Sequence, residues 1–183
     1  MRHALRGRHL TFFTAVAAVI VSTIAGIAIA RAQGAGAANG AASGLPVPRF
    51  VSLKSDKVNM HIGPAKTYEV KWLYQRAGLP VEITAEFENW RRIRDSEGTE
   101  GWVYHSLLSG RRTGVVTTKT KDELVALHDS ANQKSDVVAE LQPGVLATIK
   151  RCSGTWCRVS GQGFDGWFPQ ERLWGVYPSE KVD

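Results

Sequence analysis

Hydrophobic and polar residues alternate along much of the chain after residue 50, and this alternation predicts short β-strands. The clearest case runs from Leu79 to Phe87, where Val81, Ile83 and Ala85 interleave with acidic and hydroxyl side chains. Gly, Pro, Asp and Ser separate the runs and are typical of turns between strands. The period of an amphipathic helix is found nowhere in this part of the sequence. The pattern therefore predicts an all-β fold of small barrels, each made of about five or six short strands.

One motif within this pattern occurs twice. The first copy has WRRI at residues 90–93 and GTEGWV at residues 98–103, and the second has WCRV at 156–159 and GFDGWF at 163–168. Each copy is typical of two strands joined by a tight turn, because glycine supplies the positive φ that the turn needs. The repetition predicts two domains of one kind, each of about 60 residues. The match extends upstream, where residues 58–61 align with 125–128 and residues 70–74 align with 137–141.

The chain before residue 50 differs in composition from both repeats. Residues 1–32 contain an arginine-rich start, an apolar run from Phe12 to Ala30 and the sequence Ala-Arg-Ala, which together indicate a secretory signal peptide. The apolar run is long for a signal, so a retained membrane anchor is the second interpretation. The next residues are rich in Ala, Gly, Asn and Ser and predict a flexible linker. The predicted organisation is a signal or anchor at 1–32, a linker at 33–49, a first domain at 50–113 and a second domain at 114–178.

The net charge gives no support to a nucleic-acid partner. The formal charge is +6, but four of the 23 Lys and Arg residues lie in residues 1–32, where none of the 17 Asp and Glu residues lie. The rest of the chain contains 19 basic and 17 acidic residues, an excess of only two positive charges. A nearly neutral exported chain lacks the basic surface that nucleic acid binding requires. We predict no nucleic-acid partner, and membrane contact only through an uncleaved N-terminal segment.

The repeated motifs resemble those of the bacterial SH3 (SH3b) domain. The resemblance rests on VNMHIGP at residues 58–64 and on the two segments of the first copy given above, and it covers both repeats. His61 stands where the family usually has arginine, and the second copy keeps His128 there without the following Gly-Pro. The resemblance implies two tandem SH3-like barrels. It also implies recognition of cell-wall peptides or other extended segments, because bacterial SH3 modules commonly bind these and often accompany cell-wall hydrolases.

Residues for catalysis or for metal binding are few. The two cysteines, Cys152 and Cys157, lie in one predicted hairpin, and His61 and His128 hold the same strand position in the two copies, which favours a scaffold role. Acyl transfer needs a nucleophile, a base and an orienting group together, and structural zinc prefers two short cysteine pairs. We therefore predict no catalytic residue, cofactor or metal, and a cell-wall hydrolase is only a remote alternative.

Comparison of the copies sorts the aromatic residues. Trp90 and Trp102 recur as Trp156 and Trp167, which predicts that all four are structural core. Tyr68 and Trp72 align with Ser135 and Ala139, so they are specific to the first copy. Such residues contact either a ligand or the other barrel, and both interpretations stay open. Arg91 belongs to a charged hairpin that is either a solvated edge or a patch for an anionic polymer. The candidate ligand-binding residues are Tyr68, Trp72, Tyr74, His61 and Arg91.

A disulfide is predicted between Cys152 and Cys157. Four residues separate them, and a hairpin loop of that length sets the two cysteines directly opposite each other. By the same alignment they correspond to Glu86 and Arg91, which are opposite charges at facing positions. The oxidising compartment that a secretory signal implies permits the bond. Two buried free thiols are the alternative.

Together these features predict an exported protein of the periplasm or cell envelope. Its predicted function is non-catalytic recognition of peptidoglycan, as cell-wall peptide or glycan, or of an extended peptide segment. The alternative function is that of an accessory or assembly protein of the envelope that binds only protein partners.

Overall fold

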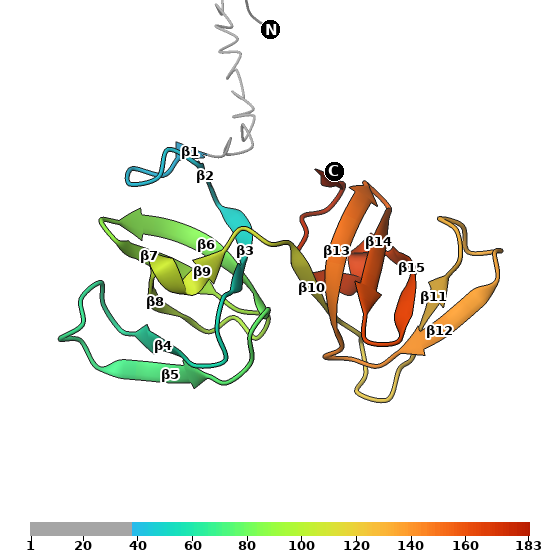
Figure 1. Cartoon of the computed structure of the whole chain (residues 1–183), viewed down its shortest axis with the longest axis horizontal. Helices are drawn as coiled ribbons and strands as arrows, with labels where there is room; N and C mark the ends of the chain where they lie inside the picture. The colour runs from blue at the N-terminus through green and yellow to red at the C-terminus, as the bar shows by residue number, and fades with distance from the viewer. Residues whose placement is uncertain (1–37) are drawn as a thin grey trace, which may run out of the picture. The chain divides into compact units, whose positions relative to one another are not determined.

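Residues 38–183, which the computed structural model describes, fold almost entirely into short β-strands (Figure 1). The predicted signal or anchor at residues 1–32 lies outside the described residues. Within residues 38–183 no helix is long and apolar enough to cross a membrane. Two single turns of 3₁₀ helix, His105–Leu107 and Gln170–Arg172, are the helical segments in this part of the chain. The prediction of an all-β fold is therefore confirmed.

Each repeat forms one antiparallel sheet that curls into a barrel, and the two sheets have the same topology. The first sheet has the strand order β5-β4-β8-β7-β6-β3-β9, and the second has the order β12-β11-β15-β14-β13-β10-β16. Strand for strand the two orders correspond, which confirms two tandem barrels of one kind. The strands of the first sheet are β3 (Arg49–Leu53), β4 (Val58–His61), β5 (Val70–Tyr74), β6 (Pro80–Phe87), β7 (Trp90–Arg94), β8 (Glu100–Tyr104) and β9 (Leu108–Ser109). Those of the second are β10 (Thr113–Val116), β11 (Val125–His128), β12 (Val137–Leu141), β13 (Leu146–Ser153), β14 (Trp156–Gly161), β15 (Phe164–Pro169) and β16 (Leu173–Trp174).

The second sheet extends beyond the predicted range of 114–178 at both ends. It begins at Thr113, and a further short strand, β17 (Lys181–Val182), pairs with the end of β13. The pairing places Val182 opposite Cys152, so the C-terminal residues complete the second barrel.

Each barrel encloses its own hydrophobic core. The first core contains Val51, Leu53, Val58, Met60, Tyr74, Val81, Ile83, Ile93 and Val103. The second contains Val116, Leu127, Leu141, Ala147, Ile149, Cys152, Cys157, Val159, Phe168, Leu173 and Val176. One buried aromatic residue lies in each cluster, but at different positions. Tyr74 aligns with Leu141, and Phe168 aligns with Val103, so the two cores distribute side-chain volume differently within one topology.

The four repeated tryptophans lie outside both core clusters; Trp90 is buried as predicted, whereas for the other three the prediction of structural core is wrong. Trp90 is buried but belongs to neither cluster, and Trp102, Trp156 and Trp167 are only partly buried. The reason is the alternation of side chains along a strand. In β8 the buried residues are Gly101 and Val103, so Trp102 between them lies on the outer face.

The β6–β7 hairpin and the β13–β14 hairpin each have the predicted strand register. Cys152 pairs directly with Cys157 and is joined to it by a disulfide. In the first barrel Glu86 pairs directly with Arg91, and the two side chains form an ion pair at 3.2 Å. The predicted disulfide is confirmed. The same hairpin carries a covalent bond in one barrel and an ion pair in the other.

Removing the disulfide is expected to lower the stability of the second barrel. Replacing Cys152 and Cys157 together with alanine should cost about 2 kcal/mol of unfolding free energy, because the bond closes only a short loop of the unfolded chain. The effect is measured by urea denaturation without reductant, with Thr155→Ala in the same hairpin loop as the control. An unchanged midpoint in the double variant would show that the bond contributes nothing to stability.

Part of the predicted linker is folded onto the first barrel. Strands β1 (Ala38–Asn39) and β2 (Pro46–Val47) form a small antiparallel hairpin. The Glu86 carboxylate accepts hydrogen bonds from the backbone N–H of Ser43 at 2.8 Å and from its hydroxyl at 2.6 Å. Arg49 donates to the same carboxylate at 2.7 Å. The prediction of a flexible linker is therefore wrong from residue 38 onward, because a buried carboxylate binds the polar groups of this segment.

Aromatic residues that the sequence analysis did not single out join the two barrels. The Phe50 ring lies 5.1 Å from Trp174 in an edge-to-face arrangement and 4.7 Å from Tyr177. The Tyr177 hydroxyl donates to Glu82 at 2.9 Å. Phe50 and Trp174 align with Thr113 and Ser109, so they too are specific to one copy.

Candidate ligand-binding groove

The outer face of the first barrel carries a group of aromatic side chains on three neighbouring strands. In β4 the side chains of Val58 and Met60 are fully buried, so Asn59 and His61 lie on the opposite face. The strand next to β4 is β8, and β7 follows it. These strands contribute Tyr104 and Trp90, which are cross-strand partners.

The rings of these residues pack edge to face. The His61 ring lies 5.3 Å from Trp90 at an interplanar angle of 83°. Trp90 lies 5.5 Å from Tyr104 at 85°. The Lys66 ammonium lies over the Tyr104 ring, 5.9 Å from its centre. Edge-to-face packing fixes the ring orientations, so the outer face presents a rigid aromatic surface with a cation beside it.

This aromatic surface forms one wall of a groove with a volume of about 550 Å³. Lysines are the charged residues that line it, and the lining contains no Asp or Glu. A groove with this lining favours a ligand that combines an apolar part with a carboxylate or another anion. The lining residues are Lys57, Asn59, His61, Lys66, Leu73, Trp90, Tyr104 and Leu107.

His61 fixes the loop that follows β4. Its Nδ1 lies 2.8 Å from the carbonyl oxygen of Tyr68, and because a carbonyl only accepts, Nδ1 carries the hydrogen. In the second barrel His128 makes the same contact with the carbonyl of Ser135 at 3.1 Å. The two histidines thus share a scaffold role.

Two of the predicted ligand-binding residues are buried, and for them the prediction is wrong. Tyr74 is only 5% exposed, and its hydroxyl donates to Asp95 at 2.9 Å. Burial, together with the Asp95 carboxylate, raises the pKa of that hydroxyl. The Arg91 guanidinium bonds the carbonyl of Glu88 at 2.9 Å and pairs with Glu86. The polar groups of both side chains are already paired within the protein, and neither side chain lines the groove.

Tyr68 and Trp72 are exposed, but they lie outside the groove. The Tyr68 ring covers Gly63, where an added Cβ would come within 2.7 Å of the ring. Trp72 is 53% exposed and lies on the face of β5 opposite to Leu73, which lines the groove. Of the five candidates, only His61 lines the groove.

Sequence reasoning missed Lys57, Lys66 and Tyr104. The comparison between the copies contains a signal for Tyr104, because this residue aligns with Pro169 and is therefore specific to the first copy. Isolated surface lysines carry no comparable signal, since charged residues are common on any solvated face.

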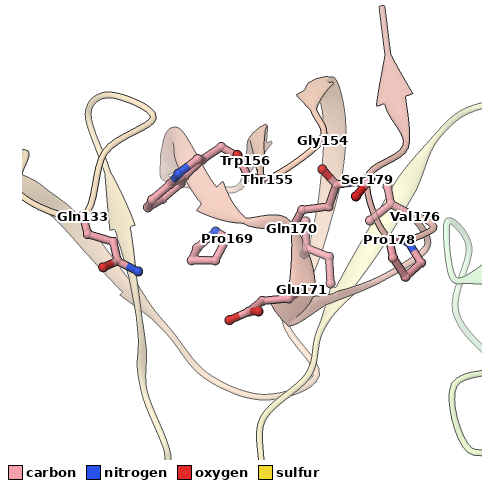
Figure 2. Close-up of a pocket in the computed structure, with 11 residues that line it drawn as sticks. Gln133, Gly154, Thr155, Trp156, Pro169, Gln170, Glu171, Val176, Pro178 and Ser179 are labelled. Atoms are coloured by element: carbon pink, nitrogen blue, oxygen red, sulfur yellow. The ribbon is translucent and has the colours of Figure 1, made fainter.

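The second barrel has a hollow of about 510 Å³ around the equivalent tryptophan, Trp156. Figure 2 shows Trp156 and Pro169 between Gln133 on one side and the C-terminal segment with Val176 on the other. Gln133 and Pro169 replace Lys66 and Tyr104 of the first barrel. The second hollow therefore lacks both the cation and the phenol ring, and it does not reproduce the first groove.

Neither barrel has the side chains of a metal site. No group of His, Cys, Asp and Glu within residues 38–183 is arranged to hold a metal ion. The two cysteines of the sequence are joined in the disulfide, and His61 and His128 bond to backbone carbonyls.

Comparison with known proteins gives one family match. The bacterial SH3 domain matches at residues 54–110 and again at residues 121–175. A search of curated proteins finds no match. Two solved structures from Trichomonas vaginalis are similar, NlpC2 at 11% identity and a TM-score of 0.31, and NlpC1 at 12% and 0.30. The alignments cover 69% and 73% of this chain and 48% of each of those chains, so this chain spans about half their length.

Proposed function

Because the chain belongs to the bacterial SH3 domain family, whose members often bind cell-wall components, we propose that it is a non-catalytic binding protein of the cell envelope. Its ligand is a carboxylate-bearing peptide segment of the cell wall. The observation that supports this ligand is the groove of the first barrel, where two lysines flank an aromatic wall and no acidic residue lines the surface.

The chemistry of the groove fits such a peptide. The Lys57 and Lys66 ammonium groups attract a carboxylate, and charge complementarity speeds association and selects against cationic ligands. The Tyr104 ring, supported from behind by the mostly buried Trp90, offers a flat apolar surface to the peptide backbone or to a small side chain. Asn59 adds a donor and an acceptor for a peptide group.

The disulfide supports both the non-catalytic and the exported parts of the proposal. The disulfide consumes both cysteines, so no thiol of the chain is free for nucleophilic attack. Disulfides persist in oxidising compartments, which agrees with export through the predicted signal or anchor.

Binding to purified peptidoglycan sacculi tests the proposal. The protein should sediment with sacculi, and Lys66→Gln should weaken binding about three- to ten-fold, because one charge contact in a partly desolvated groove contributes about 1 kcal/mol. The substitution introduces the residue that the second barrel has at this position, Gln133. Lys150→Gln, which removes an equally exposed charge from the second barrel, is the control and should bind like the unchanged protein.

Two results would contradict the proposal. Failure of the unchanged protein to bind sacculi would favour an accessory protein with only protein partners. Equal binding by Lys66→Gln and the unchanged protein would show that the ligand is held elsewhere.

A further inference from the structure

The first barrel has a further hollow, on the face of β5 opposite to the groove. Lysines line the groove, whereas acidic residues line this hollow. Its volume is about 340 Å³, and its lining includes Trp72, Asp95 and Glu97 but no Lys or Arg. We propose that this hollow binds a primary ammonium group at the end of an alkyl chain, as in the side chain of a diamino acid of a cell-wall peptide. The source of the amine rests on the proposed function, whereas the preference for an ammonium group rests on the hollow alone.

Trp72 supplies the aromatic surface that a cation requires. The strand β5 is the edge of its sheet, and more than half of the Trp72 side chain is exposed there. Its indole ring is the strongest side-chain acceptor of a cation–π contact. The apolar wall of the hollow continues to Leu79 and to Val115 of the second barrel, which suits an alkyl chain.

The carboxylates of the hollow are held in place by the turn after β7. Asp95 accepts the backbone N–H groups of Glu97 at 3.0 Å and Thr99 at 2.8 Å, and it also accepts the Tyr74 hydroxyl. Glu97 projects from this ordered turn, and within residues 38–183 its carboxylate has no hydrogen-bond or ion-pair partner. Burial raises the pKa of Tyr74, and the charges of Asp95 and Glu97 raise it further, which agrees with a negative potential in the hollow.

At the corresponding positions the second barrel has neither the aromatic residue nor the acidic residues of this hollow. Ala139 stands at the position of Trp72, and the turn that corresponds to residues 95–98 contains Gly161, Gln162 and Gly163. The scaffold therefore folds without any of these side chains. Asp95 has a structural role in the first barrel as the partner of the Tyr74 hydroxyl, but Trp72 and Glu97 have none there, and their presence together indicates a binding role.

The two surfaces of β5 would recognise complementary parts of one ligand. Leu73 lines both the lysine-lined groove and the acidic hollow, whereas Trp72 lines the hollow alone. A peptide that carries both carboxylates and a free side-chain amine could engage both faces across this edge strand. A neutral or purely anionic segment could engage only the groove.

Titration with small model amines tests this site, followed in every variant by the backbone amide NMR signals of residues 95–97 and, where Trp72 is present, also by its indole N–H signal. The probe is Nα-acetyl-lysine methylamide, and Nα-acetyl-norleucine methylamide, which lacks the ammonium group, is the comparison. We expect the lysine compound to shift the Trp72 signal in a salt-sensitive manner. Trp72→Ala should weaken binding about three- to ten-fold, and Glu97→Gln about two- to five-fold.

Matched controls separate the site from general surface effects. Phe87→Ala removes an equally exposed aromatic residue, and Glu69→Gln removes an exposed carboxylate from outside the hollow. Both should bind the lysine compound like the unchanged protein. Trp72→Ala introduces the residue of the second copy, so its unfolding midpoint should stay close to that of the unchanged protein.

Three results would overturn the inference. These are equal shifts with the norleucine compound, unchanged affinity in Trp72→Ala, and concentration-dependent self-association that Trp72→Ala abolishes without any response to the amine. The outcome is distinct from that of the sacculus experiment. Binding to sacculi without a response to the amine refutes only this site, and a response to the amine without binding to sacculi refutes only the proposed function.

Discussion

Replacing Phe168 with alanine is expected to cost about 3–5 kcal/mol of unfolding free energy, the usual effect of deleting a buried aromatic side chain. The same change at the adjacent Trp167 should cost only about 1–2 kcal/mol, although tryptophan is larger. Phe168 is 0% exposed in the core of the second barrel, whereas Trp167 lies on the outer face of β15 with the Arg151 guanidinium 5.2 Å from its ring. The loss at Trp167 is therefore partial burial and one cation–π contact. Urea denaturation of both variants at neutral pH measures the difference.

The first barrel offers the corresponding control. Trp102 and Val103 occupy the aligned positions. Trp102→Ala should therefore also cost less unfolding free energy than is usual for a side chain as large as tryptophan. If Trp167→Ala destabilises the protein as much as Phe168→Ala, the outward position of the repeated tryptophans is incorrect.

The fold was predictable because the sequence contains it twice. Alternation alone gives strands, but the repeated hairpin also gave their register. Glu86 and Arg91 aligned with Cys152 and Cys157, and both pairs proved to be directly opposed. Two independent residue pairs at one register leave no room for a shift by one residue, which would move every side chain to the other face.

The face of each tryptophan was not predictable from repetition. A residue that recurs is required in both copies, but the recurrence does not say whether its side chain lies on the inner or the outer face of the sheet. The short stretch Gly101-Trp102-Val103 shows the ambiguity, since a large aromatic and an aliphatic residue compete for the core. The structure places Gly101 and Val103 inside, and the alternation of side chains along β8 then puts Trp102 on the outer face.

The candidate site depends on contacts between residues that are far apart in the sequence. Lys66 reaches the Tyr104 ring from a loop, and Val115 of one barrel closes the hollow beside Trp72 of the other. The sequence analysis selected Trp72 correctly as a residue specific to one copy, but it left open whether the residue meets a ligand or the other barrel. Phe50, Trp174 and Tyr177 make the aromatic contacts between the barrels, and Val115 of the second barrel lines the hollow beside Trp72.

Glu86→Gln is expected to cost about 2–3 kcal/mol of unfolding free energy at neutral pH. Burial of the carboxylate by itself raises the pKa of Glu86, but hydrogen bonds from Ser43 and Arg49 and the charge of Arg91 outweigh it and lower the pKa from 4.5 to about 2. Folding therefore releases the proton, and the unfolded chain binds it more tightly at acidic pH. The stabilisation is fully present above about pH 4.5 and is lost as the pH falls towards 2.

A pH series separates this ion pair network from every other acidic group in the protein. Urea denaturation of the unchanged protein and of Glu86→Gln between pH 7 and pH 2 should give free energies that converge as the pH falls. The control is Glu88→Gln, an exposed carboxylate two residues along the chain, and its difference from the unchanged protein should stay near zero throughout. A constant difference between Glu86→Gln and the unchanged protein would mean that the glutamate acts through its shape rather than its charge. Loss of the network should also loosen residues 38–45 from the first barrel, because Ala42 and Ser43 bond to this carboxylate, whereas Val47 still packs against the core. Protease cleavage within residues 38–45 should then become faster in Glu86→Gln alone.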